Sequence, residues 1–211
     1  MRAPLDAVLA TRNAGKLREL QPLFERVGIR VVTLDALGLA EQAEEDALEA
    51  FETFEENALA KARHFHAAAG RPAFADDSGL CVAALGGAPG VRSKRWSGRA
   101  DLHGAALDAT NCERLLAELP ADADAAAAFV CAAAYVDGAL ELVALGQVAG
   151  SVIRERRGAG GFGYDPFVHI PELGTTFAEA DVATKERVSH RGRAFRGLLQ
   201  QMGSADGSAL R

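Results

Sequence analysis

Short apolar runs typical of strands are interspersed with amphipathic segments typical of helices along the whole chain, without a strict alternation. Residues 7–11 and 29–34 are two such apolar runs. Thr53 and Glu56 have the spacing of a capping box, which predicts a helix from there to about Ala69. This mixture predicts an α/β fold with a mixed twisted sheet.

In the middle of the chain, a strand at residues 73–75 and an apolar run at 80–85 are separated by polar residues and a glycine. This pattern predicts a turn over residues 76–79. Asp76 and Asp77 would then stand at the end of a strand, in a fixed position.

The rest of the chain is predicted to contain two helices, a β-hairpin, a further strand and a long loop. Loops of that length in a compact domain are usually functional. The predicted ranges are 105–119 for one helix, 125–136 and 139–145 for the hairpin, 148–153 for the strand and 156–174 for the loop. The last helix starts near Ser189 and is predicted to bury Ala194, Phe195, Leu198 and Met202.

The length of 211 residues predicts a single domain over residues 1–211, in one core or two abutting lobes, with a flexible tail from about residue 203. Three widely spaced cysteines indicate neither a disulfide framework nor a zinc cluster. No basic, apolar leader and no apolar span of membrane length is visible, so no membrane association is expected and the cytoplasm is the expected location.

The net charge of -6 argues against extended nucleic-acid binding, which requires a broad basic surface. A small anionic ligand remains possible, because it needs only a few cations that converge in one cleft. The candidates for these cations are Lys16, Lys61, Lys185 and Arg191.

The segment ATRNAGKLREL, residues 10–20, is a polar loop between a strand and a helix N-terminus, which favours a phosphate. Lys16 would add a full charge. Ala10 and Leu17 replace the first glycine and the Ser/Thr of a P-loop, so a Walker-type kinase or GTPase is disfavoured. The alternative is a surface loop with a solvated lysine.

The segment FADDSGL, residues 74–80, contains adjacent carboxylates, which are the oxygen ligands that magnesium prefers. A carboxylate beside the metal can also orient or deprotonate an attacking water. The alternative is a turn in which Asp76 or Asp77 caps backbone N–H groups. Asn57 and Lys61, four residues apart, share one helix face.

Two later segments offer groups that suit a nucleoside. In GGFGYDP, Phe162 and Tyr164 offer rings for stacking on a base, and Asp165 offers acceptors, whereas the alternative is a tight turn with aromatic core anchors. His190 and its neighbours at the start of the last helix offer donors that would suit a purine with a keto group at position 6. Adenine carries an amino group at that position, so two hydrogen-bond donors would face each other there.

The five segments ATRNAGK, FEENALAKA, ADDSGLCVAALGGAPGV, GGFGYDPF and VSHRGRA occur in an order that closely resembles the inosine triphosphate pyrophosphatase family, also described as XTP/dITP diphosphatases. The resemblance implies a two-lobed mixed α/β fold with the active site in the cleft between the lobes. It also implies a homodimer, a Mg²⁺ cofactor, and hydrolysis of ITP, dITP and XTP to the monophosphate and pyrophosphate.

The resemblance further implies a role for individual residues. It assigns the triphosphate to Thr11, Arg12, Asn13, Ala14, Gly15, Lys16 and Lys61. It assigns metal binding and proton acceptance to Asp77, with Ser78 beside it at the substrate. It assigns the base and sugar to Phe162, Gly163, Tyr164, Asp165, Lys185, His190 and Arg191.

The chain departs from the family pattern at two places. Its acidic segment before the FEENA helix is longer, so Glu44, Glu45 and Glu49 compete as the second metal ligand, and Glu45 is our choice. Arg92 and Lys94 stand where many relatives show Tyr and Ala, and these cations either touch the phosphates or are solvated.

The hypothesis that follows is that Asp77 activates a water for attack at the α-phosphorus, with release of pyrophosphate. An enzymatic alternative is a related pyrophosphatase that acts on dTTP or UTP. A second alternative is a nucleotide-sensing protein that binds without hydrolysis. The residues alone give no physical account of how GTP, which also carries a 6-keto group, would be excluded.

Overall fold

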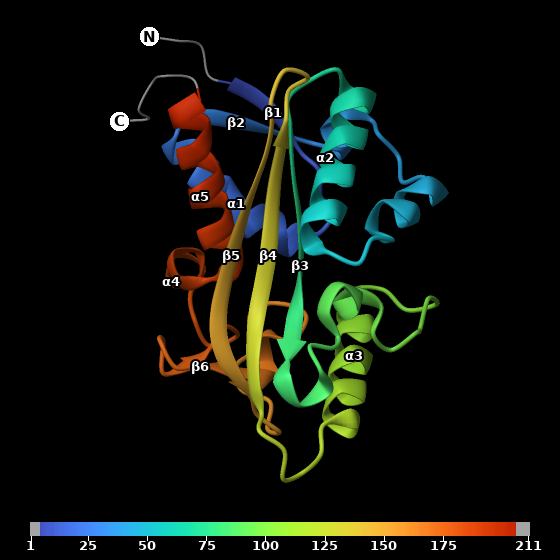
Figure 1. Cartoon of the computed structure of the whole chain (residues 1–211), viewed down its shortest axis with the longest axis vertical. Coiled ribbons are helices and arrows are strands. Elements are labelled where there is room, and N and C mark those ends of the chain that lie inside the picture. Colours follow the sequence, from blue (N-terminus) through green and yellow to red (C-terminus); the bar gives the residue numbers. More distant parts are fainter. Residues whose placement is uncertain (1–4, 206–211) are drawn as a thin grey trace. The chain divides into compact units, whose positions relative to one another are not determined.

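The structure of the chain is a computed structural model that describes residues 5–205, except for the side chains at positions 43, 44 and 46. Its helices and strands are labelled in Figure 1. The strands are β1 (Leu5–Leu9), β2 (Ile29–Thr33), β3 (Ala73–Val82), β4 (Ala126–Val136), β5 (Glu141–Val152), β6 (Val168–Ile170) and β7 (Thr175–Thr176). The helices are α1 (Ala14–Arg26), α2 (Phe54–Ala69), α3 (Gly104–Glu118), α4 (Val182–Val188) and α5 (His190–Ala205).

The strands form one sheet in the order β2-β1-β3-β4-β5-β6-β7. β1 pairs in parallel with β2 and with β3, whereas β6 pairs antiparallel with β5 and with β7. α1 connects β1 to its parallel neighbour β2, since parallel strands need a crossover between them. Both kinds of pairing occur, so the predicted α/β fold with a mixed sheet is confirmed.

The chain divides into two compact units. Within the described residues, the first unit comprises residues 5–77, 131–146 and 191–205, and the second comprises residues 78–130 and 147–190. β3, β4 and β5 each contribute residues to both units.

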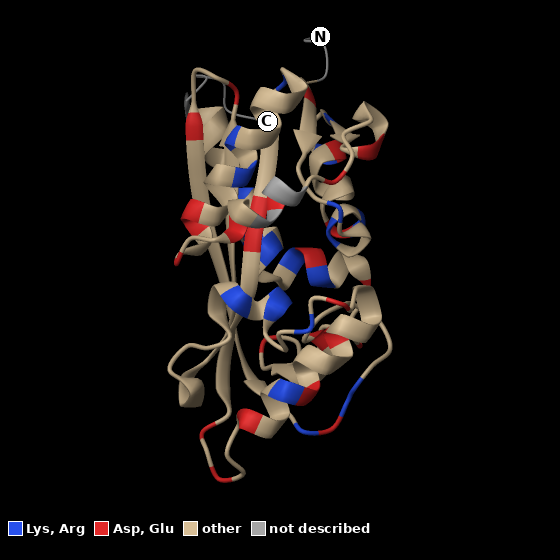
Figure 2. Cartoon of the chain, turned by 90° about the vertical axis from the view of Figure 1, so that its right-hand side faces the viewer, with Lys and Arg blue, Asp and Glu red and all other residues tan. Residues whose placement is uncertain are grey.

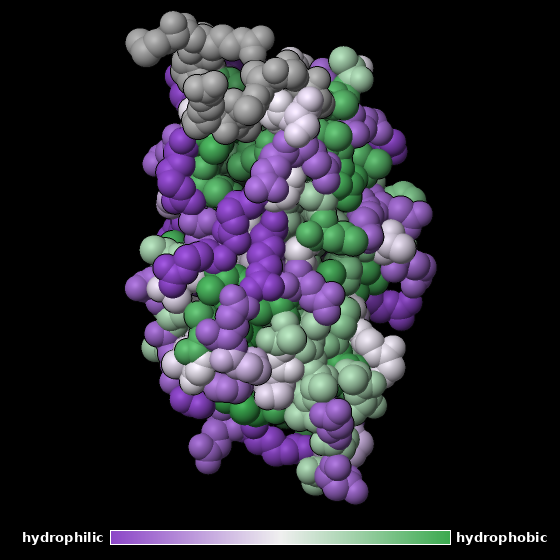
Figure 3. All heavy atoms as spheres, turned by 60° about the vertical axis from the view of Figure 1, so that its left-hand side comes forward, coloured by the Kyte–Doolittle hydropathy of each residue, from purple (hydrophilic) through white to green (hydrophobic). Residues whose placement is uncertain are grey.

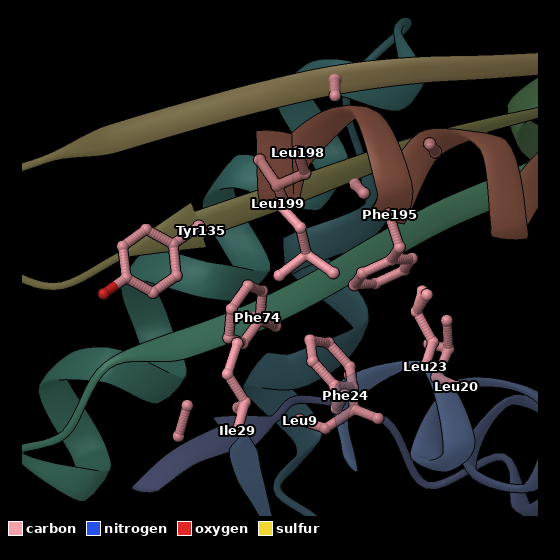
Figure 4. Packing of buried hydrophobic residues seen from close by; sticks show 14 of the residues in the cluster. Leu9, Leu20, Leu23, Phe24, Ile29, Phe74, Tyr135, Phe195, Leu198 and Leu199 are labelled. Carbon is pink, nitrogen blue, oxygen red and sulfur yellow. The ribbon is translucent and has the colours of Figure 1, made fainter. Parts of the chain in front are cut away.

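In the first unit, β3 contributes side chains to two separate hydrophobic clusters. Phe74 packs against Phe24 of α1, with ring centroids 4.7 Å apart, and against Phe195 of α5 at 6.4 Å (Figure 4). Ala73 and Ala75 instead pack in a cluster with residues of α2. Each cluster excludes water from one face of the strand, and burial of each large ring contributes roughly 2–3 kcal/mol.

These two clusters determine where the next residues of β3 point. Side chains of a strand alternate between its faces, so Asp76 shares the face of Phe74, and Asp77 shares the face of Ala75. Asp76 therefore faces α1 and α5, and Asp77 faces α2. α2 and α5 are drawn on either side of the central strands in Figure 1.

In the second unit, α3 packs through Leu115 on a cluster that includes Leu80 of β3 and Phe129 of β4. Arg154 closes the C-terminal end of this helix, because it donates to the carbonyl oxygen of Leu119 at 2.9 Å. The last carbonyl groups of a helix have no partner inside it, so such a donor stabilises its end.

The predicted turn over residues 76–79 is wrong. β3 continues through these residues to Val82, so the two aspartates lie within a strand. The turn prediction rested on Gly79, but positive φ angles in the described residues occur only at other glycines. The extended backbone persists because both carboxylates are buried with partners on the neighbouring helices, so neither has to cap the local N–H groups.

Other elements agree with the expectations in part. The predicted start of α2 is confirmed, because the Thr53 hydroxyl accepts the Glu56 N–H at 3.2 Å. The predicted hairpin is confirmed as β4 and β5, which are neighbours in the sheet. The strand predicted at residues 148–153 is the continuation of β5. The predicted loop at 156–174 contains β6 and a 3₁₀ helix, so its description as irregular is wrong in part.

Two differences concern the C-terminal part. α4 was not predicted, and it starts where Asp181 accepts the Thr184 N–H at 2.6 Å. The predicted burial of Ala194, Phe195 and Leu198 on α5 is confirmed, and Met202 is partly buried. α5 continues to Ala205, and the rest of the predicted tail, residues 206–211, lies outside the described residues.

The surface carries mixed polarity on the face drawn in Figure 3, where hydrophilic residues surround smaller hydrophobic areas. Among the described residues, no helix combines the length and the apolar character that a membrane crossing requires.

Candidate active site

Asp76 of β3 is the centre of a buried charge cluster in the first unit. Its Oδ2 lies 2.9 Å from Nζ of Lys16 on α1 and 3.1 Å from Nε of Arg191 on α5. Burial alone would raise the pKa of Asp76, but the charges of Lys16, Arg191 and Lys61 hold it well below its usual range. Asp76 is therefore ionised at neutral pH.

In the same cluster, Arg191 contacts two carboxylates. Its Nη1 donates to Oε2 of Glu19 on α1 at 2.7 Å, in addition to the contact with Asp76. Only 2% of Arg191 is exposed. Burial alone would lower its pKa, but the charges of Asp76 and Glu19 raise it. The resemblance assigns Arg191 to the base and sugar, whereas the structure shows it paired with two carboxylates.

Asp77 lies in a second group of polar residues, on the α2 side of β3. Its Oδ2 accepts a hydrogen bond from Nδ2 of Asn57 at 2.9 Å. Lys61 pairs with Glu49 and donates to the carbonyl oxygen of Asp76 at 3.1 Å. Burial raises the pKa of Asp77, and Glu49 raises it further, while Lys61 partly opposes this. The carboxylates of Asp77 and Glu49 thus both interact with the charge of Lys61.

Lys16 and Lys61 reach the same strand residue from different helices, since one contacts the carboxylate of Asp76 and the other its carbonyl group. The structure therefore brings Lys16, Lys61, Asp76 and Asp77 together in the first unit. Three separate elements supply them: α1 supplies Lys16, α2 supplies Lys61, and β3 supplies the adjacent pair Asp76 and Asp77.

The loop before α1 is organised as a helix N-cap. The side chain of Asn13 accepts the N–H groups of Gly15 at 2.7 Å and Lys16 at 3.2 Å. The hydroxyl of Thr11 accepts the Asn13 N–H at 3.2 Å. The helix N-terminus predicted as a phosphate site is present, and a phosphate there would replace Asn13 as the acceptor for these N–H groups.

Arg12 and Glu45 form an ion pair with each other. Nη2 of Arg12 lies 2.7 Å from Oε1 of Glu45, and Nε lies 3.1 Å from Oε2, which is a bidentate contact. Of the three glutamates that compete as a metal ligand, Glu49 contacts Lys61 and raises the pKa of Asp77, whereas Glu45 does neither. The side chain of Glu44 lies outside the described residues.

The acidic side chains near Asp77 have the chemistry of a magnesium site. Asp77 and Glu49 supply hard oxygen donors. The pKa of Asp77 is raised mainly by burial, with a smaller contribution from the charge of Glu49, and a divalent cation beside the two carboxylates would offset both effects. Among the described residues, no three or more His, Cys, Asp or Glu side chains form a metal-binding group. Two carboxylates fit a metal that takes its other ligands from water and substrate phosphates.

One acceptor in the cluster is left over. Oδ1 of Asp76 is buried and makes no hydrogen bond to any described group. Buried carboxylate oxygens in that state are uncommon, and they are suited to a ligand donor or a cation. Figure 2 shows how Lys and Arg, in blue, and Asp and Glu, in red, are distributed over the helices, strands and loops in general.

In the second unit, Asp165 and Lys185 form a buried ion pair with an Nζ to Oδ2 distance of 2.5 Å. The ammonium group lies over the rings of Phe162, at 4.7 Å, and Phe177, at 5.5 Å. A Cβ at Gly161 would come within 2.2 Å of Oδ2 of Asp165, so only glycine fits there. The structure thus brings Phe162, Asp165 and Lys185 together, with the lysine charge already matched by the aspartate.

Tyr164 and His190 are structural parts of the second unit. The hydroxyl of Tyr164 donates to the carbonyl oxygen of Ser93 at 2.9 Å, and the residue is only 5% exposed. The ring of His190 stacks on Phe129 at 5.0 Å. These contacts favour the alternative interpretation of Tyr164 as a core anchor. The Gly163 N–H donates to Asp108 at 2.7 Å, which holds the loop to α3.

The remaining expected residues lie as follows. Ser78 follows Asp77 on β3 and is partly exposed, and Ala14 and Gly15 form the first turn of α1. Arg92 and Lys94 lie in a 3₁₀ helix, Gly90–Arg95.

Sequence reasoning missed Glu19 as a member of the buried charge cluster, it did not connect Asn57 with Asp77, and it chose Glu45 over Glu49. Glu19 stands three residues after Lys16 on the same helix face, which was the available signal. Asn57 was noticed beside Lys61, but its contact with Asp77 depends on the packing of α2 against β3.

This geometry defines a class of protein: an α/β protein whose strand carboxylates, with lysines from two helices, form a site suited to a metal-bound polyphosphate. The chain belongs to the Ham1 family, which it matches over residues 7–201. The resemblance found in the sequence is thereby confirmed.

Individual relatives are similar over nearly their whole length. A dITP/XTP pyrophosphatase from Leptothrix cholodnii is 47% identical, with 94% of this chain and 97% of the relative covered. One from Burkholderia pseudomallei is 47% identical, with 93% and 92% covered. A solved structure of a HAM1 protein from Coxiella burnetii superposes with a TM-score of 0.80 at 36% identity, covering 95% of this chain and 99% of that one.

Proposed function

We propose that this chain is a nucleoside triphosphate pyrophosphohydrolase that converts ITP, dITP and XTP to the monophosphate and pyrophosphate, which removes deaminated purines from the nucleotide pool. Relatives that are 47% identical over almost their whole length are described as dITP/XTP pyrophosphatases. The observation that carries the proposal is the meeting of Lys16 and Lys61 at Asp76, beside the buried carboxylate of Asp77.

The two lysines would hold the phosphates, assisted by the N–H groups at the start of α1. The cluster contains the cations Lys16, Lys61 and Arg191, but these are already opposed by carboxylates. A triphosphate brings further negative charge, so binding requires an additional cation. A bound Mg²⁺ would supply that charge and offset the developing charge of the phosphates.

Asp77 and Glu49 are the residues that we propose to hold the metal, with Glu49 in place of Glu45. Glu45 is engaged by Arg12 through two contacts, and Glu49 lies in the group around Lys61 that includes Asp77. Asp77 would also accept the proton of the water that attacks the α-phosphorus. Burial raises the pKa of Asp77, which makes its carboxylate a stronger base than that of an exposed aspartate.

The resemblance assigns the base and sugar to residues of the second unit and to Arg191 of the first unit, and that assignment stays a prediction. Phe162 and Asp165 flank a lysine whose charge is already matched, so we propose that Lys185 orients Asp165 for the substrate. The role of Arg191 in base binding is less favoured than a role in fixing Asp76. The homodimer that the resemblance implies and the cytoplasmic location expected from the sequence are further parts of the proposal.

A pyrophosphate-release assay with ITP, XTP, GTP, ATP, dTTP and UTP, each with Mg²⁺ and with EDTA, tests the proposed function. We expect ITP and XTP to be cleaved at least about 100-fold more efficiently than ATP, because a donor facing the adenine amino group is mispaired. EDTA should abolish release. Preference for dTTP or UTP would favour the other pyrophosphatase type, and no release from any substrate would favour a nucleotide sensor.

A further inference from the structure

Asn57 holds the carboxylate of Asp77 from the first turn of α2. Asn57 is completely buried, and its hydrogen bonds to Phe51 and Asp77 lie within the first unit. Its Oδ1 accepts the Phe51 N–H at 2.9 Å. Its Nδ2 donates to the carbonyl oxygen of Phe51 at 3.3 Å and to Oδ2 of Asp77 at 2.9 Å. Both the oxygen and the nitrogen of the Asn57 amide thus contact the backbone of Phe51, and the nitrogen also donates to the carboxylate of Asp77.

The contacts with Phe51 fix which end of the amide faces Asp77. If the amide of Asn57 were flipped, Oδ1 would face a carboxylate oxygen and Nδ2 would face the N–H of Phe51. Both pairs would then be mispaired, and a buried mispaired group costs about 1–3 kcal/mol. The donor orientation toward Asp77 is therefore set by the backbone at residue 51.

Asp77 needs such a restraint because its charged neighbours pull in opposite directions. Lys61 attracts the carboxylate, whereas Glu49 repels it. The carboxyl group of an aspartate rotates easily about its last bond. Without Asn57, Oδ2 of Asp77 would lose this hydrogen bond, and the attraction of Lys61 would favour a carboxylate turned toward the lysine.

We propose that Asn57 is a positioning residue, which holds Oδ2 of Asp77 so that the carboxylate presents the same oxygen to the reacting water in every turnover. This inference rests on the proposed function and adds a residue to it. Asn57 does not touch the substrate in this account; it acts through Asp77. Misplacement of a reacting group by about 1 Å can cost about 100-fold in rate.

Asn111 offers a matched control. It is also a buried helix asparagine, with 3% exposure, and its amide also bridges two backbone groups. Its Oδ1 accepts the Ser97 N–H at 2.7 Å, and its Nδ2 donates to the carbonyl oxygen of Lys94 at 2.9 Å. Within the described part of the chain, both of these hydrogen bonds of the Asn111 amide go to backbone groups and none goes to a carboxylate, so the comparison with Asn57 isolates the contact with Asp77.

The experiment measures kcat and KM for ITP with saturating Mg²⁺ in the variants Asn57→Ala and Asn111→Ala. We expect Asn57→Ala to lower kcat by about 100-fold, with KM changed by less than about 3-fold. Asn111→Ala should lose comparable thermal stability but keep its kcat within about 2-fold. Equal kcat values for the two variants, or a kcat for Asn57→Ala near that of the wild type, would overturn the proposal.

The variant Asn57→Asp tests the donor role of the amide separately from its acceptor role. An aspartate keeps the acceptor for the Phe51 N–H but, when ionised, has no donor for Asp77. We expect a kcat loss at least as large as that of Asn57→Ala. A wild-type kcat in Asn57→Asp would show that the donated hydrogen bond is unnecessary, and this would also overturn the proposal.

A metal-free crystal structure of Asn57→Ala gives a readout that does not depend on turnover. We expect the Asp77 carboxylate to be rotated toward Lys61 relative to the wild-type protein. An unchanged carboxylate would contradict the inference. If the wild-type protein releases no pyrophosphate from any triphosphate, the proposed function fails, and the crystallographic comparison still decides whether Asn57 orients Asp77.

Discussion

Asp77→Asn is expected to lower pyrophosphate release from ITP by about 10²–10⁴-fold, which is the usual contribution of a general base. The substitution removes both the proton acceptor and one of the two proposed metal ligands. The hydrogen bond from Asn57 can persist, because the amide oxygen of the new side chain still accepts it. The loss should therefore appear in kcat at saturating substrate, measured by steady-state kinetics.

The fold should tolerate Asp77→Asn well. The raised pKa of Asp77 means that its charged form is disfavoured in the folded protein, so a neutral side chain should not lower the free energy of unfolding. Asp137→Asn is a suitable control, since Asp137 accepts N–H groups at the β4–β5 turn and the amide can do the same. Near-normal turnover in Asp77→Asn, with the fold intact, would refute the assignment of Asp77 as the proton acceptor.

Asp76→Asn is expected to lower the free energy of unfolding at neutral pH by about 3–5 kcal/mol. Removal of one charge from a buried ion cluster leaves its partners with less compensation: Lys16 loses its carboxylate contact, and Arg191 keeps only the contact with Glu19 of its two carboxylate contacts. Urea denaturation of the metal-free protein measures the effect. Asp101→Asn, which removes an exposed partner of Arg99, is the control and should change little. A loss below about 1 kcal/mol in Asp76→Asn would contradict the account.

The difference in the free energy of unfolding between the wild type and Asp76→Asn should depend on pH, with a definite sign. The pKa of Asp76 lies well below the value of about 4 that an aspartate has in an unfolded chain. The carboxylate therefore stabilises the folded state fully above about pH 4, and this contribution is lost as the pH falls toward the folded pKa. The gap between the wild type and Asp76→Asn should be largest near pH 7 and should narrow below about pH 4.

The fold could be predicted from local patterns where those patterns are strong. Thr53 and Glu56 marked the start of α2, and Asp137 with Gly138 marked the β4–β5 turn. The prediction failed at residues 76–79, because Asp, Asp, Ser and Gly have turn preferences that depend on local hydrogen bonding. Tertiary ion pairs to Asp76 compensate the buried carboxylate in the strand, which no local pattern reveals.

The site could be predicted as a set of segments but not as a set of contacts. The motifs pointed to Lys16, Lys61 and the aspartate pair, and the structure brings these residues together. The choice among Glu44, Glu45 and Glu49 could not be made from spacing, because it depends on how a 3₁₀ helix, Ala43–Glu49, packs beside α2. The burial of Arg191 between two carboxylates likewise depends on residues 172 positions apart.

The most direct test of the account is a crystal structure of the wild-type protein with Mg²⁺ and an ITP analogue whose α,β bridge resists hydrolysis. We predict metal density between the carboxylates of Asp77 and Glu49, and phosphate oxygens at Lys16, Lys61 and the first turn of α1. Phosphates bound elsewhere on the protein, or a metal held by Glu45 instead of Glu49, would contradict it.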